Sequence, residues 1–359
     1  MNSPKLTRIL INALSGIGDA LMFTPALVKI KEALPDSKIE VLVMYKGVKE
    51  IYERIPEADN VIYFDFLEQG IFKSLKFIFS LRGKYDSSIN VCPSNRKEYN
   101  IINRIIGAKK RAGIRYLRND FSNLGFLNNL TVKENDDLHN VEENIRMAEL
   151  VLDQKITDIP PLKIVLNDED ETYSVNYLQQ KNITPGEFVV GFHAGCSTLK
   201  NHEKRRWETE KFAELAKRII EKYNAKILLF GGPEESGIKE KIISLASSEN
   251  IVSVETQSLM QSNAVMKRCN LFVTNDSGLM HIAAALQLKV VAVIGPTSLN
   301  YIHPWQTEYK TATLNLECAP CFIYSPKPLT CTRKDVQFKC IKELDVELVF
   351  GKVKEFLEK

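Results

Sequence analysis

Residues 8–27 read RILINALSGIGDALMFTPAL, and this stretch sets the pattern that the rest of the chain repeats. The apolar run over residues 8–14 predicts a buried strand. A turn containing Gly16 and Gly18 follows directly, and apolar residues then recur at helical spacing up to Pro35. A strand that leads through a glycine turn into a helix is typical of parallel α/β sheets.

The same alternation of strand and helix continues along the chain. Further apolar runs that predict strands are KIEVLVM, NVIYFD, SSINVC, EFVVGFHAG, AKILLFGG, NIVSV, LFVTND and KVVAVIGP. The rhythm weakens between residues 130 and 158, and 359 residues exceed the size at which one core usually stops growing. We therefore expect an α/β fold with two facing Rossmann-like domains, residues 1–163 and 164–342, followed by a C-terminal helix over residues 343–359.

The composition excludes several classes of protein. A net charge of +3 is too small to imply a nucleic-acid partner. Asp19 and Pro25 interrupt the only apolar stretch near the start, which argues against a signal peptide, and no run reaches the ~18 apolar residues of a membrane span. We expect a cytoplasmic protein, with peripheral contact at the cytoplasmic face of the membrane as a further possibility.

Residues 273–286 read VTNDSGLMHIAAAL, in which a strand meets a helix at a polar turn. Gly278 would let a ligand approach the backbone, and the N–H groups and dipole of the helix favour an anion, most simply a diphosphate. His281, one turn into the helix, could add a hydrogen bond. The alternative is structural: Asp276 or Ser277 caps the helix, and His281 packs against the sheet.

Residues 191–215, GFHAGCSTLKNHEKRRWETEKFAEL, place a small-residue turn before a basic loop, Lys200–Arg206, of formal net charge +3. A Lys or Arg over a pyrophosphate would neutralise charge on a leaving group. The alternative is a solvated loop, with Trp207 as a hydrophobic staple for the next helix.

Two further turns carry carboxylates. After AKILLFGG, Glu234 or Glu235 could accept hydrogen bonds from ribose hydroxyls, although acids are also common at helix starts. In the opening stretch, Asp19 follows the glycine turn, where a carboxylate is suited to accept a proton from an attacking hydroxyl. The alternative role for Asp19 is a helix cap.

Three blocks together resemble glycosyltransferase family 9, the ADP-heptose:lipopolysaccharide heptosyltransferases: GIGDALMFTPAL, HAGCSTLKNHEKRRW, and TNDSGLMHIAAAL followed by VVAVIGPT. The resemblance spans nearly the whole chain. It implies the GT-B fold, with a cleft between its domains, and an inverting transfer that requires no cofactor. It also implies an ADP-sugar donor carrying heptose or a related sugar, and a lipopolysaccharide core or other cell-surface glycan as acceptor. A GT-B-like sugar-nucleotide epimerase and a non-catalytic nucleotide-sugar-binding protein are the alternatives.

The resemblance also assigns roles to residues. Asp19 matches the general base that deprotonates the acceptor, and Arg205 matches a cation that holds the departing diphosphate. Cys196 stands where family members often have Thr, and the basic loop Lys200–Lys204 is an insertion. The expected donor-binding residues are Gly195, Cys196, Arg205, Glu234, Glu235, Asp276, Ser277, Gly278 and His281, and the expected acceptor-binding residues are Gly16, Gly18, Arg96 and Arg118.

Two stretches bear on a membrane partner. Residues 96–118 have a formal net charge of +7, and on one shared face they could bind a phosphorylated lipid core and an anionic membrane, or they are ordinary surface cations. Residues 70–82, GIFKSLKFIFSLR, could lie on a membrane as an amphipathic helix. We expect a core helix instead, because Phe77 occupies the would-be polar face.

The chain has seven cysteines, an odd number that argues for reduced thiols in a protein without an export signal. Cys318, Cys321, Cys331 and Cys340 have the spacing C-x2-C-x9-C-x8-C, whose first half fits a zinc site and whose second half lacks a tight ligand pair. We expect reduced thiols in a loop, with a structural metal or a disulfide as alternatives, and the sequence assigns no metal ligand.

Overall fold

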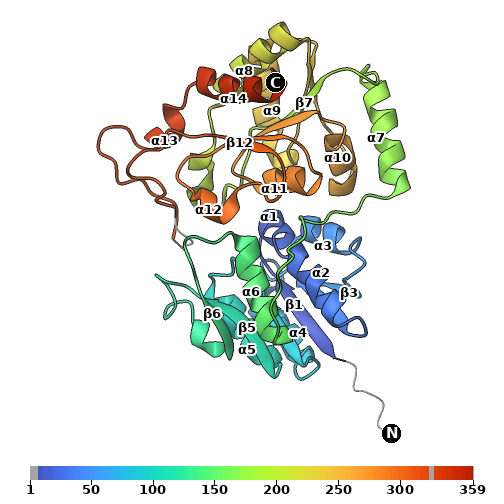
Figure 1. Cartoon of the computed structure of the whole chain (residues 1–359), viewed down its shortest axis with the longest axis vertical. Coiled ribbons are helices and arrows are strands. Elements are labelled where there is room, and N and C mark those ends of the chain that lie inside the picture. The colour runs from blue at the N-terminus through green and yellow to red at the C-terminus, as the bar shows by residue number, and fades with distance from the viewer. Residues whose placement is uncertain (1–6, 323–326, 359) are drawn as a thin grey trace. The chain divides into compact units, whose positions relative to one another are not determined.

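The computed structural model describes residues 7–322 and 327–358, which form two compact units, each built on a parallel sheet (Figure 1). The first unit comprises the described residues through Val165 together with Asn300–His303, and the second comprises the remainder. The expected α/β architecture with two parallel sheets is confirmed.

The first sheet has the strand order β3-β2-β1-β4-β5-β6, and every neighbouring pair is parallel. Its strands are β1 (Arg8–Ala13), β2 (Lys38–Val43), β3 (Asn60–Tyr63), β4 (Ser87–Asn90), β5 (Lys110–Arg115) and β6 (Leu130–Lys133). The helices are α1 (Ile17–Leu21), α2 (Thr24–Ala33), α3 (Lys46–Tyr52), α4 (Gly70–Ser80), α5 (Lys97–Ile106), the 3-10 turn η1 (Gly125–Leu127) and α6 (Asn140–Leu152). The strand order reverses between β1 and β4, so their carboxyl ends form the switch point where such sheets bind ligands.

The second sheet repeats this plan with the order β12-β11-β10-β7-β8-β9. Its strands are β7 (Val189–His193), β8 (Lys226–Leu229), β9 (Ile251–Ser253), β10 (Leu271–Asn275), β11 (Val290–Val293) and β12 (Tyr309–Ala312). The helical elements are α7 (Asp168–Gln180), η2 (Leu199–Arg205), α8 (Thr209–Tyr223), η3 (Pro233–Glu235), α9 (Ser236–Ala246), α10 (Leu259–Met266), α11 (Gly278–Ala285), α12 (Leu299–Ile302), α13 (Lys339–Lys342) and α14 (Val346–Leu357). Here the switch point lies between β7 and β10.

Buried asparagine side chains tie α5 to the first sheet. Asn12 of β1 donates to Asn90 of β4 at 2.9 Å and to Asn103 of α5 at 3.2 Å. Asn100 of α5 accepts hydrogen bonds from Asn90 at 2.9 Å and from Asn128 at 2.7 Å. Because buried amides need partners, this network fixes α5 on the switch point and with it the residue at the start of that helix, Arg96.

The helix over residues 70–82 corrects one expectation. Within α4 only Ile78 is fully buried, and Phe77 is half-buried, stacked on Phe64 with ring centroids 4.1 Å apart. Four large apolar side chains of α4 are exposed to solvent: Ile71, Phe72, Leu75 and Phe79. The core-helix prediction was therefore wrong. Phe77, on the side of α4 with fewer apolar residues, packs inward, and the side that carries the four exposed residues faces solvent. No helix among the described residues is long and apolar enough to cross a membrane.

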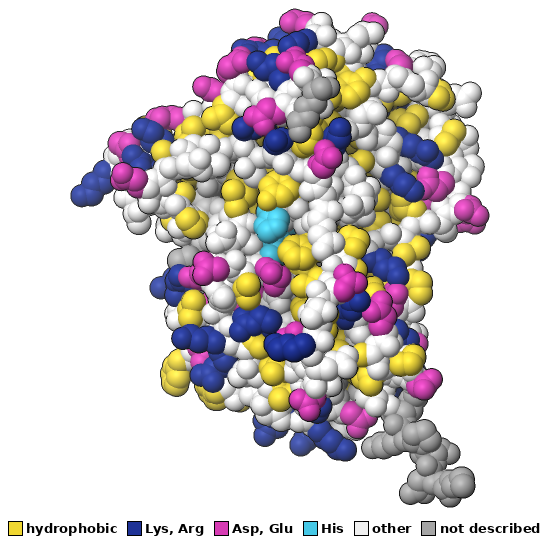
Figure 2. All heavy atoms as spheres, viewed as in Figure 1, with side chains coloured by type: hydrophobic (Ala, Val, Ile, Leu, Met, Phe, Trp, Pro, Cys, Tyr) yellow, Lys and Arg dark blue, Asp and Glu magenta, His cyan; other side chains and the backbone are white. Residues whose placement is uncertain are grey.

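The cations of residues 96–118 do not share one face. Arg96 and Arg118 lie beyond the carboxyl ends of β4 and β5, whereas Arg104, Lys109 and Lys110 lie toward the amino ends, because α5 runs back along the sheet. On the molecular face drawn in Figure 2, Lys and Arg side chains are interspersed with Asp and Glu. The cations of residues 96–118 therefore do not form the single basic face that was one of the two alternatives, which favours ordinary surface cations.

Candidate active site

An ion pair anchors the basic loop to the carboxyl edge of the second sheet. Arg205 Nη1 donates to Asp276 Oδ2 at 2.5 Å, and the two side chains are only 10% and 8% exposed. Thr297 donates to the same carboxylate oxygen at 2.6 Å, and the Phe322 ring lies 5.1 Å from the guanidinium carbon. The loop is therefore not simply solvated: it delivers one buried cation to the start of α11. Among the described residues, Arg205 Nε is a buried donor without a hydrogen-bond partner.

A buried histidine that the residue assignments missed joins two of the expected donor-binding residues. His193 Nε2 lies 3.0 Å from Glu235 Oε2, and its Nδ1 lies 2.9 Å from Ser277 Oγ. Burial acts to raise the pKa of Glu235, but the hydrogen bond from His193 and the charge of Arg206 lower that pKa below its usual value. Glu235 is therefore ionised at neutral pH. Because a carboxylate can only accept, His193 Nε2 carries the proton that it shares with Glu235.

The structure separates the two acids that the sequence left as alternatives. Glu234 is exposed, whereas Glu235 is 6% exposed and points toward the turn after β7. A Cβ atom on Gly195 would lie 1.6 Å from Glu235 Oε1, and one on Gly231 would lie 2.5 Å from Oε2. Gly231 also has a positive φ of 150°, which only glycine adopts readily. The two glycines therefore make room for the carboxylate of Glu235.

Neither Asp276 nor Ser277 caps the start of α11 with its side chain, although the structural alternative for this turn predicted such a cap. Ser277 is the N-cap residue, but its side chain makes no cap hydrogen bond and lies against His193 instead. Asp276 is engaged by Arg205, and His281 is buried one turn into the helix. The first N–H groups of α11, beginning at Gly278, therefore lack a side-chain acceptor from the N-cap residue.

Two residues hold the turns of this edge together. Asn275 is fully buried at the end of β10, where its Nδ2 donates to Ala194 O at 2.8 Å and its Oδ1 accepts from Trp207 N at 3.0 Å. Trp207 precedes α8 and packs on Phe212 with ring centroids 5.0 Å apart, which is the staple that the sequence suggested. Cys196 lies in the same turn, where its thiol contacts the His202 carbonyl at 3.1 Å.

In the first unit, Asp19 and Arg96 stand on the two turns that flank the switch point. Asp19 is partly buried in the first turn of α1, after β1, and Arg96 is the N-cap residue of α5, after β4. Burial raises the pKa of Tyr45, the Arg96 charge lowers it and the Asp19 charge raises it, and the same three influences act on Tyr99. Both charges therefore lie near the two tyrosines, and Tyr99 donates to Leu14 O at 2.8 Å.

The other expected acceptor-binding residues differ in their surroundings. Gly16 is exposed and caps α1 with open space around it, whereas Gly18 is buried inside that helix. Arg118 pairs with Asp136 at 2.5 Å, and Tyr301 donates to the same carboxylate at 2.6 Å. The charge of Arg118 is thus already compensated within the first unit.

The seven cysteines are all free thiols in the described structure. Burial first, and then the nearby Cys321, Cys331 and Cys318, together raise the pKa of Cys340 to about 11. Among the described residues, no group of three or more His, Cys, Asp or Glu side chains has the arrangement to hold a metal ion. The disulfide alternative is not what the structure shows.

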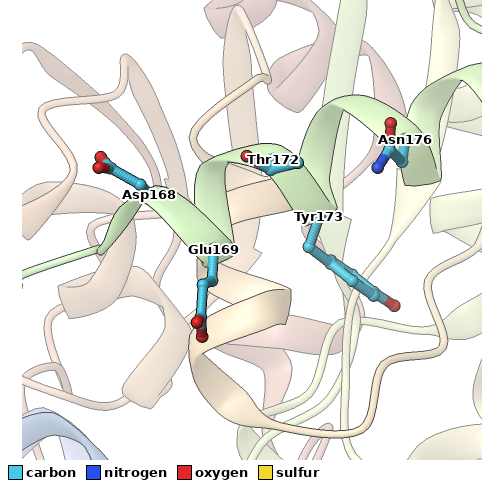
Figure 3. Close-up of a pocket in the computed structure, with 5 residues that line it drawn as sticks. All are labelled: Asp168, Glu169, Thr172, Tyr173 and Asn176. Carbon is cyan, nitrogen blue, oxygen red and sulfur yellow. The ribbon is translucent and has the colours of Figure 1, made fainter.

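A shallow hollow on α7 is a separate feature (Figure 3). It is lined by Asp168, Glu169, Thr172, Tyr173 and Asn176. All five come from one helix, and in Figure 3 Asp168 and Glu169 point in different directions rather than toward a common centre. The hollow therefore lacks the convergent polar groups of a substrate site.

A family model described as "Glycosyltransferase family 9 (heptosyltransferase)" matches residues 74–329, well over half of the chain. The chain belongs to glycosyltransferase family 9. It is 26% identical over 362 residues to lipooligosaccharide heptosyltransferase 2 of Campylobacter jejuni, covering 98% of both chains. The structure is similar to that of E. coli ADP-heptose lps heptosyltransferase II, with a TM-score of 0.74, 22% identity, and coverage of 98% of this chain and 99% of that one.

A second solved structure is E. coli heptosyltransferase WaaC with ADP, at a TM-score of 0.63, 20% identity, and coverage of 98% of this chain and 97% of that one. These matches confirm the GT-B architecture for the two units and the expected resemblance to heptosyltransferases. Family 9 membership over most of the chain identifies an enzyme, a heptosyltransferase, rather than an epimerase or a non-catalytic binding protein.

Proposed function

We propose that the chain transfers heptose, with inversion, from an ADP-sugar to a lipopolysaccharide or lipooligosaccharide core. The observation that carries this proposal is the convergence of Arg205, Glu235 and the start of α11 on the switch point of the second sheet, in a family 9 chain. An E. coli relative has been solved with ADP, and two further relatives are named lipooligosaccharide heptosyltransferase 2 and ADP-heptose lps heptosyltransferase II. These names support the donor and acceptor classes.

The second unit binds the donor through complementary groups. The diphosphate lies over the N–H groups of Ser277 and Gly278, where the helix dipole favours an anion, and Arg205 Nε supplies a donor that is otherwise unsatisfied. Glu235, ionised and held by His193, accepts hydrogen bonds from the ribose hydroxyls. Gly195, Cys196 and His281 line the same edge.

The first unit binds the acceptor and supplies the base. Asp19 accepts the proton of the acceptor hydroxyl, whose oxygen attacks the anomeric carbon from the face opposite the diphosphate. Gly16 leaves space beside Asp19 for a sugar, and Arg96 contributes a cation on the neighbouring turn. Arg205 and the α11 amides stabilise the charge that develops on the departing ADP.

Product analysis tests the proposal. The protein is incubated with ADP-heptose alone and with ADP-heptose plus a de-acylated core oligosaccharide, after a thermal-shift screen of nucleotide sugars. The proposal expects stabilisation by ADP-heptose and release of ADP with a heptosylated product only when the oligosaccharide is present. Conversion of the sugar nucleotide without an acceptor, or stabilisation without turnover, would overturn it.

A further inference from the structure

The exposed apolar side of α4 is a feature of the first unit that the transfer chemistry does not use. Ile71 is 69% exposed, Phe72 86%, Leu75 36% and Phe79 50%. Residues 71, 75 and 79 are four apart and residue 72 is three from residue 75, so these four side chains, the α4 face, form one stripe along the helix. Side chains of this size are seldom left in water together without a partner.

The α4 face is distinct from the packing that holds the helix. Phe77 and Ile78 supply the inward contacts, Phe77 by stacking on Phe64 and Ile78 by joining the core beneath α4. The helix therefore keeps its place without the α4 face, and the exposed stripe is available to an external partner.

The charges around this stripe specify the partner. Residues 70–84 contain Lys73, Lys76, Arg82 and Lys84 and no acid, and all four cations are exposed. In the described part of the chain, none of these cations forms an ion pair. A second copy docked by a two-fold axis would place these cations against the same cations, which repel. An anionic lipid surface complements both the cations and the apolar stripe.

We propose that the α4 face inserts into anionic lipid and holds the enzyme at the membrane surface that carries its acceptor. This inference rests on the proposed function only for the identity of the acceptor. The chain enters α4 from the carboxyl end of β3, so Ile71 and Phe72 lie toward the sheet edge that also carries the Asp19 turn. Lipid bound by these residues would keep a glycolipid acceptor near that edge.

Vesicle flotation of the full-length protein tests the proposal. Vesicles of phosphatidylcholine with about a third phosphatidylglycerol are compared with pure phosphatidylcholine. The wild type binds the anionic vesicles. The double substitution Ile71→Ser, Phe72→Ser lowers the partition coefficient at least about tenfold, because both side chains lose the free energy of transfer of their apolar surface into lipid. Lys73→Gln with Lys76→Gln lowers it several-fold. Val175→Ser, at a 51% exposed apolar residue of α7, is the matched control and leaves binding unchanged.

Two measurements, turnover with a soluble acceptor and vesicle binding, test the membrane proposal separately from the proposed transfer reaction. Turnover with a de-acylated, water-soluble core oligosaccharide is the same in the Phe72→Ser, Ile71→Ser variant and the wild type, which also shows that the variant is folded. Equal vesicle binding by wild type and variant would overturn the proposal. So would sedimentation showing that the wild type self-associates through these residues and does not bind vesicles. Vesicle binding without any heptose transfer would leave this proposal standing and remove the proposed function.

Discussion

The substitution His202→Gln makes the electrostatics of the basic loop measurable. Burial first, and then the charges of Arg205 and Lys200, together lower the pKa of His202 from its usual 6.5 to about 4. The Arg205 guanidinium lies 3.4 Å from the imidazole, and the ring packs edge-on against Phe322 at 5.1 Å. Protonating His202 in the folded protein therefore costs free energy that the unfolded chain does not incur.

The size and sign of the effect follow from this difference in pKa. The gap between 6.5 and about 4 corresponds to about 3 kcal/mol for a fully shielded ring, and partial exposure reduces it to about 2 kcal/mol. Because the folded-state pKa is the lower one, the stability is fully present above pH 6.5. It is lost as pH falls from 6.5 toward 4, where the unfolded chain takes up the proton first.

Calorimetric melting of wild type and His202→Gln between pH 7.5 and 4.5 provides the assay. Gln keeps the backbone carbonyl that Cys196 contacts but cannot take up a proton in this range. Between pH 7.5 and pH 4.5, the free energy of unfolding of the variant should increase by about 2 kcal/mol relative to that of the wild type. This corresponds to a shift of several degrees in the difference between their Tm values. A difference in stability between the two proteins that stays constant with pH would refute the reasoning. A wild type that gains stability relative to the variant as the pH falls would also refute it.

The remaining predictions concern the donor site and the core. Arg205→Met should raise the Kd for ADP roughly 10- to 100-fold, the worth of a charge-assisted contact, with Arg205→Lys in between, measured by calorimetric titration; equal Kd values for all three proteins would contradict the assignment. Glu235→Gln should weaken ADP binding about tenfold whereas Glu234→Gln, at the exposed neighbour, should not, and the reverse order would show that the wrong acid was chosen. Asn100→Ala should lower the free energy of unfolding by about 3 kcal/mol in urea, because it removes the acceptor of the Asn90 amide, one of two acceptors of the Asn128 amide and the donor to Asn123 O. Asn176→Ala on the surface of α7 should have little effect.

Periodicity and turn chemistry predicted much of the fold from the sequence. Buried strands such as β1 and β10 are largely apolar, and the polar, glycine-containing turns that follow them mark the binding edge. The edge strand β12 escaped prediction because its sequence, YKTA, is short, polar and partly exposed. A strand of this kind has no apolar run to announce it.

Other features depend on tertiary contacts that no local pattern encodes. Periodicity identified α4 as a helix, but the stacking of Phe77 on Phe64 decides which arc faces water. The choice of Glu235 over Glu234 depends on the space left by Gly195 and Gly231. His193 lay in a turn already singled out, yet its link to Ser277 joins residues 84 positions apart.

The kinetics of Asp19→Asn test the central claim most directly. The substitution removes the proton acceptor from the first unit and leaves Arg205, Glu235 and α11 of the second unit untouched. With ADP-heptose and a core oligosaccharide, kcat should fall roughly 10²- to 10⁴-fold while the Kd for ADP stays within about twofold of the wild type. Turnover near the wild-type rate would contradict the account.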